Sequence, residues 1–279
     1  MILSLGDLLV DITIVTAGRL RPDDDNPASI TVGGGGQAAN FCAWAVTQGE
    51  KVRLVAKLGD DESGHGLVAE MEALGVEVFA IWGPEPTGAI AVLVAPNGER
   101  TMATQRGASV GLRPDELRKE WFSDVQLIHV PAYSLFREPL ASSAHAAIAM
   151  VRRGGGLLSI DLSSVAGLKE YGPARMAADL ARFKPEFLFA TVAESQALGV
   201  PLEGLAVVPV VKLGAAGSRV AGRDVRAPAV RVVDPTGAGD AFAAAFCAAY
   251  LRGASPIEAA ERAVLVATDA VSHVGARPA

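Results

Sequence analysis

Two kinds of apolar segment alternate along most of the chain, and this alternation limits the folds that the chain can adopt. Short apolar runs typical of β-strands lie at residues 2–5, 52–56, 125–130, 157–160, 187–190, 207–212 and 219–221. Longer segments with a helical period lie between them, at 38–48, 66–73, 114–121, 140–152, 174–181, 241–252 and 256–272. The alternation predicts an α/β fold in which helices cover both faces of a mostly parallel sheet.

Two stretches interrupt this alternation, and we expect them to form a small β lid over the substrate. They are about 11–32 and 81–106, and the second contains the hairpin signal Pro96-Asn97-Gly98. The chain has 279 residues and 50% hydrophobic content, so it can bury a full core. We therefore predict one domain over residues 1–279 that includes this lid.

Charge and hydropathy narrow the choice of partners. A net charge of -6 gives no electrostatic footprint for nucleic acid or for an acidic membrane surface, so the expected substrate is a small molecule. Met1 leads directly into an apolar strand without a basic leader, and no apolar run approaches the ~18 residues of a membrane span. We expect a cytoplasmic protein with no nucleic-acid or membrane partner. Cys42 and Cys247 lie in apolar helical runs, which is typical of buried thiols.

A glycine-rich motif precedes the predicted helix at 241–252 and reads Asp234-Pro235-Thr236-Gly237-Ala238-Gly239-Asp240. The Gly-Ala-Gly turn lets backbone N–H groups crowd around an anion, and the helix that follows adds the positive end of its dipole. Asp240 lies in the first turn of that helix, within reach of a hydroxyl brought up to a bound phosphate. This combination predicts phosphoryl transfer to an alcohol.

A different motif supports a competing interpretation. Gly33-x-Gly35-x-x-Ala38 matches a dinucleotide-binding fingerprint, and Asp60 follows at about the ~20-residue spacing of a ribose-binding acid. On spacing alone, the chain could be a nucleotide-binding oxidoreductase. That hypothesis leaves the glycine-rich motif before Asp240 without a role.

Several segments resemble one family of enzymes. Residues 234–242 (DPTGAGDAF) resemble the C-terminal signature of the PfkB or ribokinase-like family of carbohydrate kinases, and residues 35–40 (GGQAAN) resemble its N-terminal signature. Residues 55–64 are similar to the family's GxDxxG segment, and Thr87-Gly88 with Gly98-Glu99-Arg100-Thr101 are similar to its lid hairpin. The resemblance implies a ribokinase-like three-layer sandwich with a β lid. It also implies ATP-dependent phosphorylation of a hydroxyl on a small sugar or sugar-like substrate.

The resemblance assigns the catalytic residues. Asp240 corresponds to the base that takes the proton from the acceptor hydroxyl. Gly237, Ala238 and Gly239 correspond to the anion hole, which binds through backbone N–H groups. Losing one donor of such a hole typically costs ~2.7 to 4 kcal/mol of transition-state stabilisation.

The substrate residues follow from the same resemblance. Asp11 resembles the sugar-binding aspartate, and Gly35, Gly36 and Asn40 match positions that contact sugar hydroxyls. Arg106 lies near a position where some relatives that use keto-deoxy acid sugars have an arginine, which could pair with a substrate carboxylate. An acidic sugar, a neutral sugar or polyol, and a nucleoside therefore stay open as substrates.

Residues 211–217 resemble the family's nucleotide-binding TLGxxG turn, which assigns Lys212, Gly214 and Gly217 to ATP. Lysine replaces the family's threonine at 212, and either a contact with phosphate or exposure to solvent is consistent with this change.

Metal ions are also implied. Glu194 corresponds to the glutamate of an NxxE motif that organises Mg²⁺, although Thr191 replaces its asparagine. Asp234, Ala270 and Gly275 match the positions of a monovalent-cation (K⁺) site in relatives.

Two further questions stay open. The departures at Thr191 and Lys212 favour a sugar sensor without activity, whereas the intact Asp240 argues against one. Lids of this family can also pair two copies, so a homodimer through the lid is an alternative to a monomer.

Overall fold

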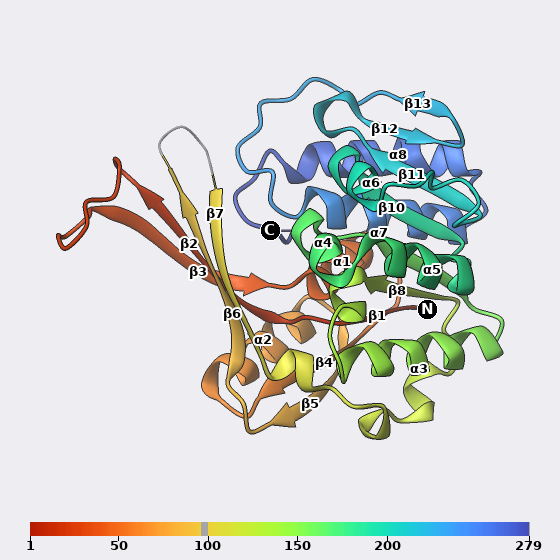
Figure 1. Ribbon diagram of the computed structural model, residues 1–279, viewed down its shortest axis with the longest axis horizontal. Coiled ribbons are helices and arrows are strands. Elements are labelled where there is room, and N and C mark those ends of the chain that lie inside the picture. Colours follow the sequence, from red (N-terminus) through yellow and green to blue (C-terminus); the bar gives the residue numbers. More distant parts are fainter. Residues whose placement is uncertain (96–99, 279) are drawn as a thin grey trace.

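The computed structural model describes residues 1–95 and 100–278. It is a large α/β sandwich with a separate small sheet that projects from one side (Figure 1). The strands of the large sheet are β1 (Ile2–Leu5), β4 (Val52–Gly59), β5 (Glu77–Gly83), β8 (Leu127–Pro131), β9 (Leu157–Asp161), β10 (Phe187–Thr191), β11 (Val208–Lys212), β12 (Ser218–Val220) and β13 (Arg223–Val225). The helices are α1 (Gln37–Thr47), α2 (Glu62–Ala73), α3 (Leu140–Arg153), α4 (Val165–Tyr171), α5 (Pro173–Phe183), α6 (Val192–Leu198), α7 (Ala238–Leu251) and α8 (Pro256–Ala270).

The large sheet has nine strands in the order β13-β12-β11-β10-β9-β8-β1-β4-β5. All pairs from β11 to β5 are parallel, whereas β12 and β13 form an antiparallel edge. Parallel strands place their carboxyl ends at one edge of the sheet, where α/β proteins bind ligands. The mostly parallel sheet that the alternation predicts is confirmed.

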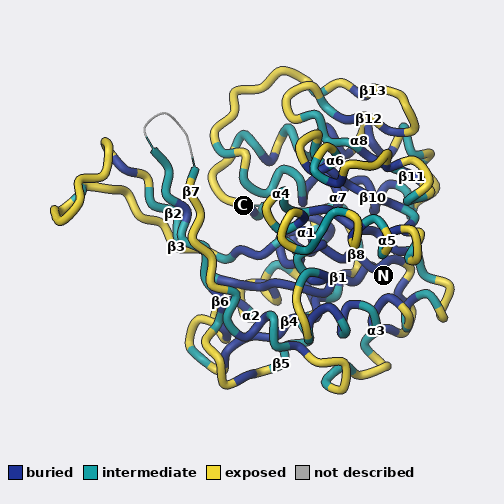
Figure 2. Tube along the Cα trace, viewed as in Figure 1, coloured by how far each residue is buried: buried dark blue, intermediate teal, exposed yellow. Residues whose placement is uncertain are grey.

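Two apolar cores lie on the two faces of this sheet. Successive side chains of a strand point to opposite faces, so Ile2 joins one core and Leu3 the other. The first core packs α1, α2, α7 and α8 against the sheet, and the second packs α3, α5 and α6 against it. Figure 2 shows the central strands buried between these layers. The expected three-layer sandwich is therefore confirmed.

The smaller sheet is the lid, with the strand order β3-β2-β6-β7. Its strands are β2 (Leu9–Thr16), β3 (Ala28–Gly35), β6 (Thr87–Val94) and β7 (Arg100–Gly107). Residues 81–83, which we assigned to the lid, instead belong to β5 of the large sheet, because they continue its parallel pairing with β4. The hairpin signal at Pro96-Asn97-Gly98 lies outside the described residues.

One face of the lid carries exposed apolar side chains. Ile12 pairs with Val32 and Ile14 with Ile30, so these four share one face, opposite to the face of Asp11. Ile30 and Val32 are 62% and 69% exposed. A second lid could cover them, so the homodimer stays a prediction.

The prediction of a helix at 114–121 is wrong. The structure has two short 3₁₀ turns there, Pro114–Glu116 and Lys119–Phe122. The Glu116 carboxylate accepts hydrogen bonds from Lys57 Nζ at 2.6 Å and from the Arg113 N–H at 2.8 Å. These contacts hold the segment against β4, and a tertiary contact of this kind overrides helical propensity.

Two other expectations concern burial and membranes. Both Cys42 and Cys247 are free and buried, as predicted. Among the described residues, no helix is long and apolar enough to span a membrane.

The turn from β3 into α1 depends on Gly36, which leads to a stability prediction. Gly36 has φ +100°, and a Cβ there would clash with the Asp7 carbonyl oxygen. We expect Gly36→Ala to lower the free energy of unfolding by about 2 kcal/mol or more. Gly66→Ala is the matched control, because exposed Gly66 lies inside α2 with no atom near its Cβ position. It should raise stability by roughly 0.5 to 1 kcal/mol. Urea unfolding measures both, and equal midpoints would contradict this account.

Candidate active site

The ends of three neighbouring strands face the start of one helix. Asp161, Thr191 and Lys212 end β9, β10 and β11. Helix α7 begins at Ala238 after the glycine-rich turn, and Gly239 lies close to Lys212: a Cβ on Gly239 would be 3.2 Å from Lys212 Nζ. The parallel pairing of these strands therefore gathers charged side chains at the positive end of a helix dipole.

The N-terminus of α7 has the geometry of an anion site. Gly237 is its N-cap, in the left-handed region with φ +77°. A Cβ at Gly237 would clash with the Ala276 carbonyl oxygen, so only glycine fits. The first N–H groups of a helix have no partner within the helix. The N–H groups of Gly239 and Asp240 lie in this first turn, whereas that of Ala238 donates to the Pro235 carbonyl oxygen at 3.4 Å. The sequence places the expected anion hole here, at Gly237, Ala238 and Gly239.

Asp240 is a buried carboxyl group at this helix start, 9% exposed. Its Oδ2 accepts a hydrogen bond from Asn40 Nδ2 at 3.1 Å. Burial is the main cause that raises the pKa of Asp240 to about 7, and the nearby Asp161 carboxylate adds to it, while Lys212 and Asn40 oppose the rise. A carboxyl group with a pKa near neutrality is suited to accept a proton during catalysis.

Lys212 is the centre of a buried cluster of charges. Its Nζ lies 2.5 Å from Asp161 Oδ2, and Asp161 is 1% exposed. Burial acts to lower the pKa of Lys212, but the carboxylates of Asp161, Glu194 and Asp240 together raise it. Lys212 therefore stays charged beside the anion site and does not point to solvent.

Glu194 has a structural partner that the sequence did not indicate. Thr191 is the N-cap of α6, and its Oγ1 accepts from the Glu194 N–H at 3.2 Å, while Glu194 Oε2 accepts from the Thr191 N–H at 2.7 Å. This reciprocal pair is a capping box, so Thr191 maintains the helix start in place of asparagine. Burial and the Asp161 charge raise the pKa of Glu194.

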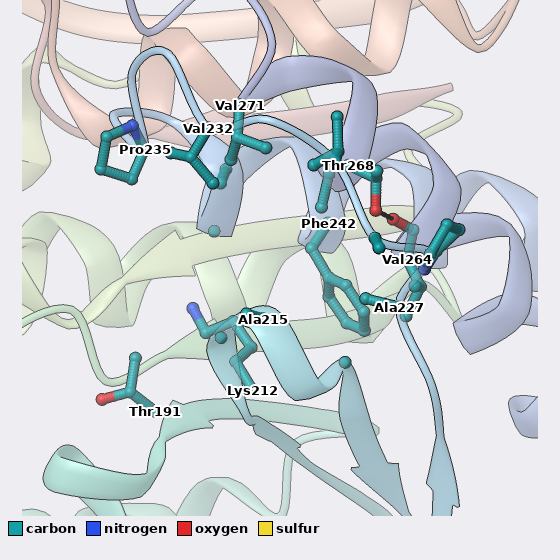
Figure 3. A pocket seen from close by; sticks show the side chains of 18 residues that line it. Thr191, Lys212, Ala215, Ala227, Val232, Pro235, Phe242, Val264, Thr268 and Val271 are labelled. Carbon is teal, nitrogen blue, oxygen red and sulfur yellow. Dashed lines mark hydrogen bonds between the residues drawn. The ribbon is translucent and has the colours of Figure 1, made fainter.

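A pocket of about 590 Å³ opens next to the anion site. Figure 3 shows Thr191 and Lys212 at one side of it, and Ala227 and Val264 at the other. Gly214, Gly217, Ala238 and Gly239 also line it, together with a mainly apolar group: Ala229, Val230, Val232, Phe242, Ala267 and Val271. Its size is that of a small-molecule site, with polar groups at one end and an apolar surface for a flat ring at the other.

A second group of side chains lies at the base of the lid and contacts Asp240 through Asn40. The Asp11 carboxylate lies over Gly35, where a Cβ would occupy its position. Asp11 Oδ1 is buried and, among the described residues, has no hydrogen-bond partner. Asn40 of α1 joins this group to Asp240. The sequence-predicted substrate residues Asp11, Gly35, Gly36 and Asn40 thus lie together at the turn from β3 into α1, and of these Asn40 contacts Asp240.

Arg106 lies at the base of the lid, between a carboxylate and an aromatic ring. It forms an ion pair with buried Asp7, and its guanidinium lies 4.0 Å from the centre of the Tyr133 ring. Ser109 Oγ donates to the other oxygen of Asp7 at 2.8 Å. The charge of Arg106 is therefore balanced within the protein, a point that the sequence did not reveal.

Arg100 of the lid strand β7 brings a positive charge to the expected monovalent-cation site. Asp234 Oδ1 accepts hydrogen bonds from Arg100 at 2.7 Å and from the Thr236 N–H at 2.9 Å, and its Oδ2 accepts from the Gly275 N–H at 3.1 Å. Burial acts to raise the pKa of Asp234, but its hydrogen bonds from Thr236 and Arg100 lower it to about 2. In this arrangement Arg100 already neutralises Asp234. Asp234, Ala270 and Gly275 therefore do not fit a K⁺ ion while Arg100 is in place.

Magnesium needs fewer protein ligands. Within the described part of the chain, no group of three or more His, Cys, Asp or Glu side chains could hold a metal ion. Mg²⁺ usually keeps several waters and uses one or two carboxylates together with substrate phosphates. Buried Glu194, whose charge acts on Lys212, fits an ion that arrives with a nucleotide, whereas Asp161 is already paired with Lys212.

Three residues at the site were missed by sequence reasoning. Asp7 and Asp161 each follow or end an apolar strand, and that position at the carboxyl edge of a parallel sheet is a signal that could have found them. Arg277 contacts Asn40 through its Nε at 3.2 Å. No pattern around Arg277 in the sequence indicates this contact.

The oxidoreductase interpretation is wrong. A dinucleotide fingerprint needs its glycines in the turn between a strand of the parallel sheet and a helix. Gly33 and Gly35 instead lie within β3, which pairs antiparallel with β2 in the lid. Asp60, the expected ribose-binding acid, pairs with His65 on the surface.

Comparisons with known proteins agree with this geometry. The family model described as pfkB family carbohydrate kinase matches residues 1–279. A 2-dehydro-3-deoxygluconokinase of Thermoproteus tenax is 32% identical over 286 residues, covering 94% of this chain and 86% of that protein. A fructokinase of Solanum tuberosum is 30% identical, covering 88% and 79%. An ATP-dependent ribose-1-phosphate kinase of Halopiger xanaduensis is 29% identical, covering 100% and 94%.

Solved structures show the same fold. A putative ribokinase II from E. coli, in complex with ATP and Mg²⁺, has a TM-score of 0.84 at 23% identity, covering 99% of this chain and 94% of that one. The fold is therefore ribokinase-like. The likenesses place the protein among the phosphotransferases that use an alcohol group as acceptor. More narrowly, the chain belongs to the pfkB family of carbohydrate kinases.

The environment of Asp240 leads to a prediction for the pH dependence of this kinase activity. A base must be deprotonated to accept a proton, and the pKa of Asp240 is raised to about 7. We expect kcat/KM to be constant above about pH 8 and to fall about tenfold per pH unit well below 7. Steady-state turnover of MgATP and sugar across this range measures it. A profile that stays flat down to about pH 5 would contradict this role of Asp240.

Proposed function

We propose that this protein transfers the γ-phosphoryl group of ATP to a hydroxyl of a small neutral sugar. Asp240 takes the proton of that hydroxyl while its oxygen bonds to phosphorus and the bond to ADP breaks. The observation that carries the proposal is the position of Asp240. It lies at the start of α7, next to Asn40 on the lid side and next to Lys212 and the anion site on the pocket side.

The nucleotide fits the pocket of about 590 Å³. Its phosphates would lie at the N–H groups of Gly237–Gly239 and beside Lys212, with Gly214 and Gly217 lining the same end. Its base would pack on Phe242 and Val264. Glu194 would help the phosphates to hold Mg²⁺, and the ion would supply positive charge to the transferring group. Support comes from the E. coli structure of the same fold, which contains ATP and Mg²⁺.

Charge balance favours a neutral substrate. The positive side chains around the site already have carboxylate partners: Lys212 has Asp161, Arg106 has Asp7, and Arg277 has Glu70. Asp11 Oδ1, by contrast, is buried and has no hydrogen-bond partner among the described residues. A buried acceptor without a partner is costly, and a sugar hydroxyl would satisfy it. An acidic sugar would add negative charge beside Asp11 and Asp240.

A substrate panel with one variant tests this function. We expect MgATP-dependent turnover with a ketose such as fructose or with an aldose, and a lower kcat/KM for 2-dehydro-3-deoxygluconate, ribose 1-phosphate and nucleosides. Asp240→Asn should keep the fold and ATP affinity but lower kcat by at least about a hundredfold. ADP release measures turnover.

The matched control is Asp60→Asn, which removes an exposed carboxylate of the same type elsewhere in the chain. It should leave turnover unchanged. Near-normal turnover in Asp240→Asn would exclude Asp240 as the base, and preference for 2-dehydro-3-deoxygluconate would exclude the neutral substrate.

Lys212 gives a separate prediction for the nucleotide side. Lys212→Met leaves Asp161 buried without its partner, so unfolding free energy should fall by about 3 to 5 kcal/mol. The double variant Lys212→Met with Asp161→Asn should recover much of this stability. Turnover should stay about a hundredfold low in both, because the positive charge beside the transferring phosphate is missing. Thermal unfolding and kcat, measured together, separate the two effects. If turnover returned with stability, the role of Lys212 would be structural only.

A further inference from the structure

The segment after α8 returns to the active site. Its Gly275 N–H donates to Asp234, just before the anion-hole turn. Trp44 Nε1 of α1 donates to the Ala276 carbonyl oxygen at 2.9 Å, and that oxygen lies against Gly237. Figure 1 shows the C-terminal end beside α1 and the base of the lid. The segment is therefore held from both sides where the next residue, Arg277, enters the substrate site.

Arg277 is almost fully buried there, with its side chain 7% exposed. It forms an ion pair with Glu70 of α2 and donates to the Gly35 carbonyl oxygen at 2.9 Å. Its guanidinium lies directly on Gly34, since a Cβ at Gly34 would overlap it. Its Nε donates to Asn40 Oδ1 at 3.2 Å.

This last contact determines how the Asn40 amide is oriented. A guanidinium can only donate hydrogen bonds, so it must face the oxygen of the amide and not the nitrogen. The Asn40 NH₂ group is thereby directed to the other side, where it donates to Asp240 Oδ2 at 3.1 Å. Without Arg277, the amide could turn over and present its oxygen to the carboxylate, which would repel it.

Arg277 also acts on the second carboxylate of the substrate site. Burial raises the pKa of Asp11, and the charge of Arg277 counteracts this rise. Loss of Arg277 would therefore raise the pKa of both carboxyl groups. It would act on Asp11 directly, through the lost positive charge, and on Asp240 indirectly, through the orientation of the Asn40 amide.

We propose that Arg277 is a positioning residue for phosphoryl transfer, which holds the Asn40 amide in the orientation that donates to the catalytic base. The inference rests on the proposed role of Asp240. The other groups that face Asp240 are Asp161 of β9, Lys212 of β11 and Gln37 of α1. Substitution of Arg277 leaves all three in place, so a change in the pH profile reports on Asn40 and Asp11.

The experiment compares kcat/KM for the sugar across pH in the full chain and its variants. In Arg277→Gln the acid limb of the profile should move up by about one pH unit. The activity loss would then be up to about tenfold greater at low pH than on the alkaline plateau. Arg277→Lys, which keeps a group that only donates, should move the limb less. Thermal unfolding shows that each variant is folded.

Two further variants isolate the contact with Asn40. Glu70→Gln removes the other end of the Arg277 ion pair on the protein surface and should leave the acid limb in place. Asn40→Ala removes the amide through which Arg277 acts. In the Asn40→Ala variant, Arg277→Gln should shift the acid limb of the pH profile by clearly less than in the native chain. The remaining shift would be the part that comes from Asp11 alone.

Three outcomes would overturn the inference. If each Arg277 variant lowered kcat/KM by the same factor at every pH, Arg277 would be a structural residue only. An equal shift with and without Asn40 would show that Arg277 does not act through the amide. In both cases the acid limb of the unaltered enzyme would still support Asp240 as the base. Absence of that limb in the unaltered enzyme would instead overturn the role of Asp240 and this inference together.

Discussion

The ion pair between Lys212 and Asp161 is the interaction on which the site depends. Asp161 is buried and Lys212 is largely covered, and the carboxylates of Asp161, Glu194 and Asp240 raise the pKa of the lysine. The parallel sheet makes this possible, since it places the ends of β9, β10 and β11 side by side. Burial and the Asp161 charge raise the pKa of Asp240, whereas Lys212 lowers it. The ion pair that links the ends of β9 and β11 thus also affects the pKa of Asp240.

Helices α1 and α7 connect the two halves of the site. They pack together in one core, and Asn40 at the start of α1 meets Asp240 at the start of α7. The segment after α8 closes this junction, because it contacts Gly237, Trp44 and Asn40. A change in the packing of α1 against α7 would therefore move Asn40 and the turn at Gly237 relative to each other.

The lid is connected to the body by arginines at its base and along β7. Arg106 pairs with Asp7 at the end of β1, and Arg100 pairs with Asp234 before the anion-hole turn. Both contacts join the lid to the body of the protein. The lid strands are otherwise much more exposed than the large sheet, as Figure 2 shows. These ion pairs therefore help to position the lid against the body.

The sequence by itself determined the layered fold, and it predicted where the site lies. Alternating strands and helices specify a parallel sheet, and the motif before Asp240 predicts an anion site, because both patterns are local in the chain. Only the tertiary structure decided the charge partners. Lys212 meets Asp161 across 51 positions, and Arg277 meets Asn40 across 237. The prediction of a helix at 114–121 was wrong for the same reason, since Lys57 of a distant strand binds Glu116. The state of a buried charge depends on which groups lie within a few ångströms, and for distant partners only the folded chain sets that distance.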